Sequence, residues 1–178
     1  MIRILRQIFR TGIVTEPMPK EVPSSDIQEV GTQLQKAVWK RFHRSLTIRQ
    51  VDAGSCNGCE LEIHAMNNAI YNCEQYGIHF TASPRFADVL LVTGPVTHNM
   101  EIALRRTYNA TPAPKLVVAA GDCGCNGGIF GESYASLGGV DKVIPVDLII
   151  PGCPPTPTAL LQGFLQLMEK MDGKGRRL

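Results

Sequence analysis

Two cysteines lie one helical turn apart in the segment VDAGSCNGCELEIHAM (51–66), where an apolar run gives way to a helical pattern. A Cys-x-x-Cys pair such as Cys56 and Cys59 can serve as a redox dithiol, as half of a zinc site or as half of an iron–sulfur site. The redox dithiol needs no further cysteines, whereas both metal sites do. The positions of the remaining cysteines therefore bear on the choice.

Three further cysteines follow apolar segments that have the character of strands. Cys123 and Cys125 come directly after KLVVAAG (115–121), and Cys153 comes after PVDLIIPG (145–152). In sheets of parallel strands, ligands bind beyond the carboxyl ends of the strands, near the switch in strand order. The sequence therefore predicts that three strand ends deliver cysteine to one edge of a sheet.

Four thiolates from three loops suit either a four-cysteine zinc site or an iron–sulfur cluster. Zinc sites in small domains usually contain two matched Cys-x-x-Cys knuckles, but this chain has one such pair and two separate loops, GDCGCNGG and PGCPP. Glycine and proline flank each cysteine loop, so backbone N–H groups can turn toward cluster sulfides. The residues favour an iron–sulfur cluster, with zinc and a thioredoxin-like dithiol as the alternatives.

Apolar strands that alternate with helices predict the scaffold for these cysteines. Strands are expected at 46–53, 79–82, 87–93, 115–121 and 145–152, and helices at 25–44, 59–76, 97–108 and 156–171. This alternation predicts an α/β fold of the flavodoxin-like kind, with a mainly parallel sheet and helices on both faces.

The helical patterns also predict which side chains face inward. The stripe of the helix at 25–44 consists of Ile27, Val30, Leu34, Val38 and Phe42. The residues expected to point inward from the helix at 59–76 are Leu61, Met66, Ala69, Ile70 and Cys73. Cys73 is expected to be a small core residue.

Arg85 either helps to neutralise an anionic group at the site or pairs with Asp88 across a turn.

Residues 1–24 read as an N-terminal arm ahead of a single α/β domain at 25–178. Ile2, Leu5 and Phe9 share one helical face, and arginines occupy another. Three prolines at 17, 19 and 23 predict an extended linker after this amphipathic helix. A helix this short needs a surface on which to lie.

The 178 residues, 44% of them hydrophobic and 19% charged, suit a globular domain with a hydrophobic core. A net charge of +2 is too small to indicate nucleic acid binding. No stretch approaches the roughly 20 apolar residues that span a bilayer, and no secretory signal follows the basic first ten residues. We therefore expect the cytoplasmic side, where six cysteines indicate metal binding or redox chemistry more than disulfides.

Four stretches closely resemble the small subunit of the membrane-bound, energy-converting nickel–iron hydrogenases, which include the formate hydrogenlyase type. The stretches are CNGCE, SPRFADVLLVTGPVT, GDCGCNGGIF and GGVDKVIPVDLIIPGCPPTPTALLQGF, and the resemblance runs from about Val51 to Met168. The same stretches are similar to the cluster-bearing subunit of respiratory complex I. In that subunit the first two ligands are adjacent cysteines, so the spacing of Cys56 and Cys59 favours the hydrogenase branch.

This resemblance implies that one 4Fe–4S cluster is bound by Cys56, Cys59, Cys123 and Cys153. Cys125 occupies a position where many relatives have another residue, and it is interpreted as a thiol beside the cluster. Only two cysteines remain, which are too few for a second all-cysteine cluster. The resemblance therefore implies a subunit of an oxidoreductase that transfers single electrons and has no catalytic residue of its own.

The resemblance also implies partners and a place in the cell. Hydrogen chemistry would occur at the nickel–iron centre of a separate large subunit, and a ferredoxin-like iron–sulfur subunit would exchange electrons with this chain. Antiporter-like, ion-translocating subunits would hold the complex on the cytoplasmic face of the cell membrane, and no nucleic acid is implied. The alternative is the cluster subunit of a complex I-like quinone or sulfur reductase that lacks nickel.

Glu60 directly follows Cys59 in the sequence and is a carboxylate with a candidate role at the site. It either complements the positive end of a helix dipole or takes part in proton transfer or contact with the large subunit.

No nucleophile, base and orienting group form a recognisable triad, because His43, His64, His79 and His98 are scattered along the chain. These histidines are expected to be structural.

Overall fold

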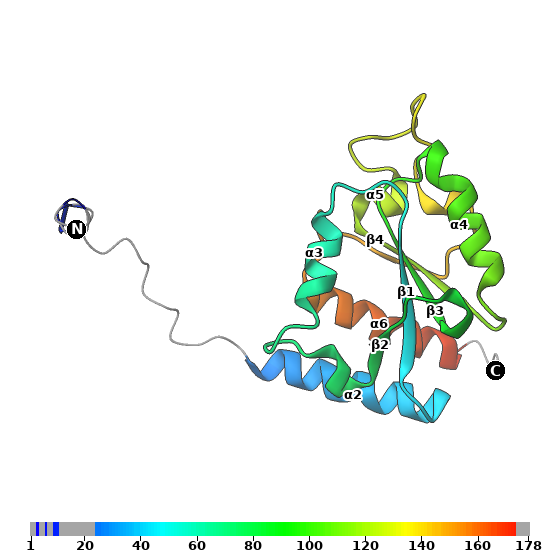
Figure 1. Cartoon of the computed structure of the whole chain (residues 1–178). Helices are drawn as coiled ribbons and strands as arrows, with labels where there is room; N and C mark the ends of the chain where they lie inside the picture. Colours follow the sequence, from blue (N-terminus) through cyan, green and yellow to red (C-terminus); the bar gives the residue numbers. More distant parts are fainter. Residues whose placement is uncertain (1–2, 4–5, 7–8, 11–23, 174–178) are drawn as a thin grey trace.

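The computed structural model describes residues 24–173, together with residues 3, 6, 9 and 10. A five-stranded sheet in the order β2-β1-β3-β4-β5 forms its centre, and every neighbouring pair is parallel (Figure 1). The strands are β1 (Leu46–Asp52), β2 (Ile78–Phe80), β3 (Val89–Thr93), β4 (Leu116–Ala120) and β5 (Leu148–Ile150). This order is that of flavodoxin-like folds, and it confirms the predicted α/β architecture.

Helices cover both faces of this sheet. The helices are α2 (Ser24–Phe42), α3 (Gly58–Ala65), α4 (His98–Ala110), α5 (Gly121–Asn126) and α6 (Pro157–Gly173), with short 3-10 helices η1 (Cys73–Tyr76), η2 (Pro84–Phe86) and η3 (Val140–Lys142). Within the described ranges, no helix combines the length and the apolar character needed to cross a bilayer. Residues 3, 6, 9 and 10 of the predicted arm are helical, and the rest of the arm and its linker lie outside the described residues.

Alternation along the strands divides the hydrophobic core into two clusters. On one face, Ile48 and Leu91 belong to a cluster that includes Leu34 of α2, Ile63 of α3 and Phe164 of α6. On the other face, the cluster includes side chains of β1, β3 and β4, Leu104 of α4, and η3 with its flanking residues. Figure 1 shows α2, α3 and α6 on the side of the sheet opposite α4. Each fully buried Leu, Ile or Phe stabilises the fold by roughly 1.5–3 kcal/mol, so these two layers hold the sheet rigid.

The helix predicted over 59–76 is wrong in its second half. Helix α3 ends at Ala65, because the side-chain oxygen of Asn68 accepts the N–H groups of Ile70 and Tyr71, at 2.9 and 3.0 Å. Asparagine thus offers the backbone an alternative to helical hydrogen bonds. As a result Ile70 is 72% exposed and Leu61 is 60% exposed, contrary to expectation, and Ala69 is exposed as well. Met66 and Cys73 are fully buried in the core, as predicted.

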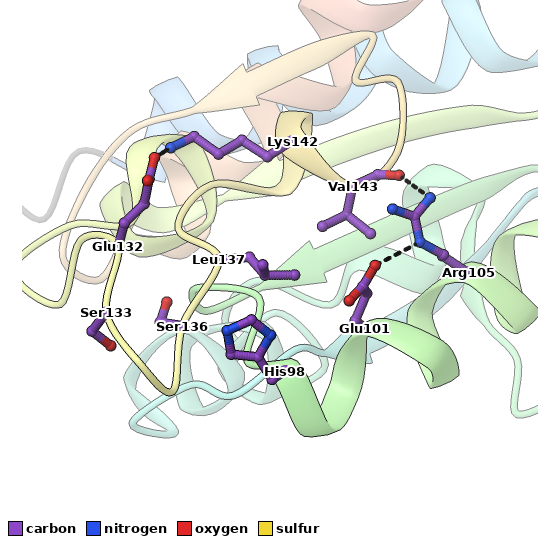
Figure 2. A pocket seen from close by; sticks show the side chains of 9 residues that line it. All are labelled: His98, Glu101, Arg105, Glu132, Ser133, Ser136, Leu137, Lys142 and Val143. Atoms are coloured by element: carbon purple, nitrogen blue, oxygen red, sulfur yellow. Dashed lines mark hydrogen bonds and ion pairs between the residues drawn. The ribbon is translucent and has the colours of Figure 1, made fainter.

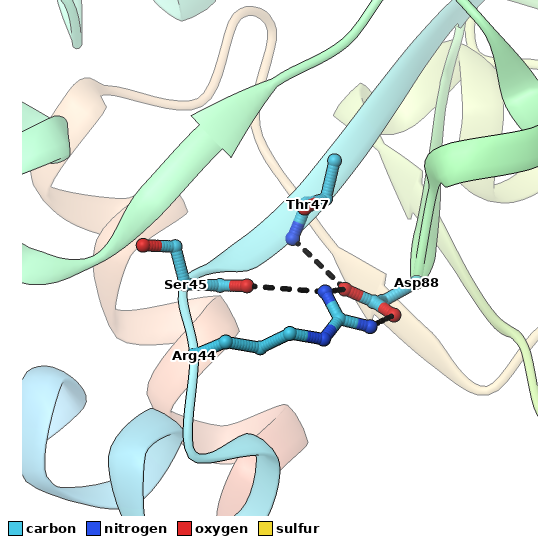
Figure 3. Close-up of polar contacts among 4 residues, drawn as sticks. All are labelled: Arg44, Ser45, Thr47 and Asp88. Carbon is cyan, nitrogen blue, oxygen red and sulfur yellow. Dashed lines mark hydrogen bonds and ion pairs between the residues drawn. The ribbon is translucent and has the colours of Figure 1, made fainter.

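Asp88 joins the amino ends of three strands through its carboxylate and its backbone, and Figure 3 shows the carboxylate between Arg44 and Thr47. Asp88 accepts hydrogen bonds from both terminal nitrogens of Arg44, at 2.8 and 2.6 Å, and from the backbone N–H of Thr47 at 3.1 Å. Its own N–H donates to the Thr47 carbonyl at 2.8 Å, and its carbonyl accepts from Leu116 N–H at 3.0 Å. The pairing of Asp88 with Arg85 is therefore wrong, and Arg44 takes that position.

Replacing Asp88 should destabilise the domain more than replacing Arg44, its cationic partner. In Asp88→Ala, the partly buried N–H of Thr47 and the Arg44 guanidinium both lose their acceptor, at an expected cost of about 2 kcal/mol. Arg44→Ala should cost less than about 1 kcal/mol, because that side chain is 55% exposed and the bond from Thr47 N–H to Asp88 remains. Urea unfolding of both variants measures the difference. Equal losses would show that the bond from Thr47 contributes nothing.

Candidate functional site: the cysteine-bearing edge of the sheet

The strand order reverses between β1 and β3, and ligands of such sheets bind at the carboxyl edge near this reversal. Backbone bonds hold the two loops together, since Ala53 N–H donates to Thr93 O and Thr97 N–H donates to Ala53 O, both at 2.9 Å. The Asp52 carboxylate accepts the N–H groups of Gly54 and Ser55 at 2.8 and 2.7 Å. These contacts set the path of the chain immediately before Cys56.

Glycines let backbone approach the cysteine sulfurs. A Cβ atom on Gly121, whose φ is +82°, would lie 2.5 Å from the Cys59 sulfur, so no other residue fits there without a shift. A Cβ atom on Gly58 would lie 3.5 Å from the Cys56 sulfur and 3.9 Å from Pro154, the residue after Cys153. The loops that follow β1, β4 and β5 therefore meet at one edge, as the sequence predicted.

A reciprocal pair of hydrogen bonds joins the loops after β4 and β5. Asp122 N–H donates to Gly152 O, and Gly152 N–H donates to the Asp122 carboxylate, both at 2.8 Å. These bonds place Cys123 and Cys153, each one residue further along, on adjoining loops. The sequence analysis missed Asp122, although an aspartate between a strand and a cysteine is a signal for such a bond.

The four predicted ligands influence one another's ionisation. Burial is the largest cause of a pKa of about 12 for the Cys59 thiol, and the adjacent Glu60 is the second. The other three predicted ligands, Cys123, Cys56 and Cys153, also raise it. Burial likewise raises the pKa of Cys123, followed by Cys153 and Cys56. Four thiolates in this arrangement repel one another, so a positive group between them is needed before all can ionise.

This set of donors fits an iron–sulfur cluster, which thiolates bind. Cys59 is buried, Cys123 is half-buried, and Cys56 and Cys153 are exposed, so the site opens toward solvent on one side. Among the described residues, no three His, Cys, Asp or Glu side chains converge closely enough to hold a single metal ion.

Cys125 is directed differently from Cys123, its neighbour in helix α5. Its sulfur lies 3.9 Å from Ala119 O and 3.7 Å from Ile150 O, so the thiol donates toward the backbone at the ends of β4 and β5. Burial is the first cause that raises its pKa to about 11, followed by Asp122 and Cys123. A thiol held in this way suits a position beside the predicted ligands.

Glu60 lies in the first turn of α3 and is only 6% exposed. One of its carboxylate oxygens accepts a hydrogen bond from the hydroxyl of Thr93, the fully buried last residue of β3. The other oxygen is buried and has no hydrogen-bond partner in the described part of the chain. A buried acceptor without a donor is costly, so this oxygen needs a reason beyond packing, and both predicted roles of Glu60 remain predictions. The sequence did not point to Thr93.

A separate cavity of 340 Å³ lies between the first turns of α4 and the loop before η3 (Figure 2). Both cations that line it are already paired. Arg105 binds Glu101 and the Val143 carbonyl, each at 2.9 Å, and Lys142 binds Glu132. His98 also lines this cavity and is not among the cysteines of the sheet edge.

The three other histidines also lie on the surface of the domain. The His43 ring lies edge-on to Trp39, with 6.4 Å between the ring centroids, and a His79 nitrogen lies 3.7 Å from a carboxylate oxygen of Glu74. His64 is exposed near the end of α3.

The protein is thus an α/β protein with a flavodoxin-like sheet, and the segments that follow β1, β4 and β5 bring cysteines to its carboxyl edge. The model of the family described as "NADH ubiquinone oxidoreductase, 20 Kd subunit" matches residues 56–167. The chain therefore belongs to this family, which confirms the resemblance found in its sequence. The matched region contains all four predicted ligands and Cys125.

Relatives in this family carry names from several complexes. Formate hydrogenlyase subunit 7 of Escherichia coli (strain K12) is 42% identical over 148 residues, which are 83% of this chain and 58% of that subunit. The "Probable membrane-bound hydrogenase subunit mbhJ" of Pyrococcus furiosus is 44% identical over 132 residues, which are 74% of this chain and 79% of that protein. The match thus spans little more than half the length of the formate hydrogenlyase subunit.

A solved structure has the same fold. It is titled "Structure of the membrane-bound sulfane sulfur reductase (MBS), an archaeal respiratory membrane complex". One of its chains superposes with a TM-score of 0.66 at 37% identity, covering 79% of this chain and 77% of that one.

Because the Cys123 and Cys125 side chains of α5 point in different directions, we expect their substitutions to have different effects. Cys123→Ala should lose nearly all iron and acid-labile sulfide after anaerobic purification, because one of the four predicted ligands of the predicted cluster is removed. Cys125→Ala should keep the wild-type content, because the Cys125 thiol donates toward backbone carbonyls. Iron and sulfide analysis of both variants measures this. The reverse result would assign the ligand to Cys125.

Proposed function

We propose that this chain is the electron-transfer small subunit of a membrane-bound, energy-converting nickel–iron hydrogenase. Cys56, Cys59, Cys123 and Cys153 would bind its single 4Fe–4S cluster. The observation that carries the proposal is the gathering of these cysteines, which occupy the family's ligand positions, at one sheet edge. The Cys-x-x-Cys spacing and the names of two hydrogenase relatives, at 42% and 44% identity, support the hydrogenase branch.

The residues of this chain would position and insulate the redox group. A 4Fe–4S cluster, when bound, accepts and releases single electrons. Buried Cys59 and the glycines packed on the sulfurs would exclude water from the inner side, and low exposure and local charge set the potential of such a group. Apart from proton transfer by Glu60, no side chain of this chain would act as an acid, base or nucleophile.

The open side of the site would face the large subunit with its nickel–iron centre. Cys56 and Cys153 are exposed there, and Ile129, at 89% exposed, and Tyr134, at 99%, lie on the loop after α5. Large exposed apolar side chains favour contact with another protein. By family resemblance, a ferredoxin-like iron–sulfur subunit and ion-translocating membrane subunits complete the complex, and the N-terminal arm would attach the chain at the cytoplasmic face of the membrane.

The second candidate is the cluster subunit of a complex I-like quinone or sulfur reductase without nickel. The specific observation in its favour is the structural similarity to a chain of the sulfane sulfur reductase complex. Both candidates use the same four cysteines in the same way. Hydrogen-dependent viologen reduction by the purified native complex distinguishes them, since only the hydrogenase catalyses it.

The cluster itself is tested by a cysteine substitution in the purified chain. The wild-type chain, prepared without oxygen, should be brown and contain about four iron atoms, with a visible band that dithionite bleaches. Cys153→Ala should be nearly colourless, because three thiolates leave one iron without its cysteine ligand. A colourless, zinc-containing wild-type preparation would refute the proposal. Full iron in Cys153→Ala would refute the ligand assignment.

Glu60 provides a test of function that is separate from cluster binding. Glu60→Gln should lower hydrogen evolution on the order of tenfold or more, the scale expected when a proton-transfer group is lost. Its iron and sulfide content should remain normal, because Glu60 is not a ligand. The control is Glu62→Gln, two residues along the same helix. Unchanged turnover in Glu60→Gln would leave this carboxylate with a structural role only.

A further inference from the structure

A second cavity, of 260 Å³, lies beside β1 at the edge of the sheet. Strand β2 pairs with β1 only from Leu46 to Ile48, and Thr81 N–H makes the last bond, to Ile48 O at 2.8 Å. From Arg49 onward, this side of β1 has no neighbouring strand. The cavity occupies that position, between α3 and residues 80–82.

Arg49 is the charged group of this cavity, and its buried Nε has no hydrogen-bond partner among the described residues. Among the described residues, no carboxylate, carbonyl or hydroxyl accepts a hydrogen bond from its Nε, although that atom is buried. The Asp52 carboxylate, three residues further along β1, is already occupied by two backbone N–H groups. A buried guanidinium nitrogen without an acceptor is costly, and an anionic ligand removes that cost.

Most of the other polar groups of the cavity offer donors, and the Gln50 side chain, which also lines it, carries both an amide NH₂ and a carbonyl oxygen. The side-chain oxygen of Asn67 accepts the Cys73 thiol at 3.0 Å, which leaves the amide NH₂ of Asn67 available. The Thr81 hydroxyl oxygen accepts Ser83 N–H at 3.4 Å, which leaves its O–H to donate. His64 also lines the cavity, and no Asp or Glu is among the described residues that do so. This set of groups complements negative charge.

The cavity contrasts with the one that contains Arg105 and Lys142, where each cation is neutralised by a glutamate. Beside Arg49, the remaining walls are apolar and include Ile63 and Phe80. The volume is below the roughly 300 Å³ at which pockets for larger ligands begin. A compact anion with a short apolar part matches both the size and the lining.

We propose that the cavity beside Arg49 binds a single anionic group, a carboxylate or phosphate, which accepts hydrogen bonds from the Arg49 guanidinium and the Asn67 amide. The group belongs either to a free small molecule or to an acidic side chain of a neighbouring subunit. This site is distinct from the four predicted cluster ligands and does not rest on the proposed function.

The first arm of the test uses the full chain, purified without oxygen, and isothermal titration with acetate, inorganic phosphate and the neutral control acetamide. Wild type should bind at least one anion and should not bind acetamide. Arg49→Gln should bind that anion at least tenfold more weakly, with an unchanged urea midpoint as evidence of folding. The matched control is Arg106→Gln, an exposed arginine on α4, which should behave as wild type.

The second arm distinguishes the source of the anion. If the chain alone binds neither anion, the group comes from a neighbouring subunit, and Arg49→Glu should lower recovery of this chain in the purified complex at least several-fold. Arg106→Glu should not lower it. The proposal is overturned if Arg49→Gln binds anions as well as wild type. It is also overturned if neither anion binds and Arg49→Glu enters the complex normally.

Discussion

Repulsion among four cysteine sulfurs is the constraint around which this protein is organised. Burial is the largest cause that raises the pKa of the Cys59 thiol, and Glu60 and the other three predicted ligands raise it further. A protein can hold such an arrangement only if the scaffold is rigid and a positive group shares the site. The parallel sheet, with one apolar layer on each face, supplies the rigidity. The proposed cluster supplies the positive charge.

Hydrogen bonds at the two ends of the sheet serve this arrangement in different ways. At the amino end, Asp88 joins the first residues of β1, β3 and β4 and so aligns the strands. At the carboxyl end, Asp52 and Asp122 accept backbone N–H groups of the loops that lead to the cysteines. Glycine contributes where a side chain would collide with sulfur, as at Gly121. Each loop thus has its own restraint, and the strands bring the three loops together.

The site has a closed side and an open side, which suits a group that exchanges electrons with another protein. Cys59, Glu60 and Thr93 form the buried side, and the exposed Cys56 and Cys153 form the open one. A carboxylate with one unpaired oxygen, buried next to a predicted ligand, places charge near the proposed redox group. The hydrogenase and the reductase relatives can share this design, because the chemistry that distinguishes them would lie in the partner subunit.

Local residue patterns predicted the fold class, the five strands in chain order, the longer helices and the meeting of the cysteine-bearing loops, because apolar periodicity and parallel-strand topology depend on such patterns. The prediction was wrong for residues 66–76, where Asn68 ends a helix that hydrophobic spacing alone would continue. Three contacts are seen only in the folded chain: Asp88 pairs with Arg44, Thr93 binds Glu60, and the Cys125 thiol donates toward the backbone. These contacts join residues that are distant in sequence or depend on the direction of a side chain. The spacing of residues along the chain indicates neither contacts between distant residues nor the direction of a side chain.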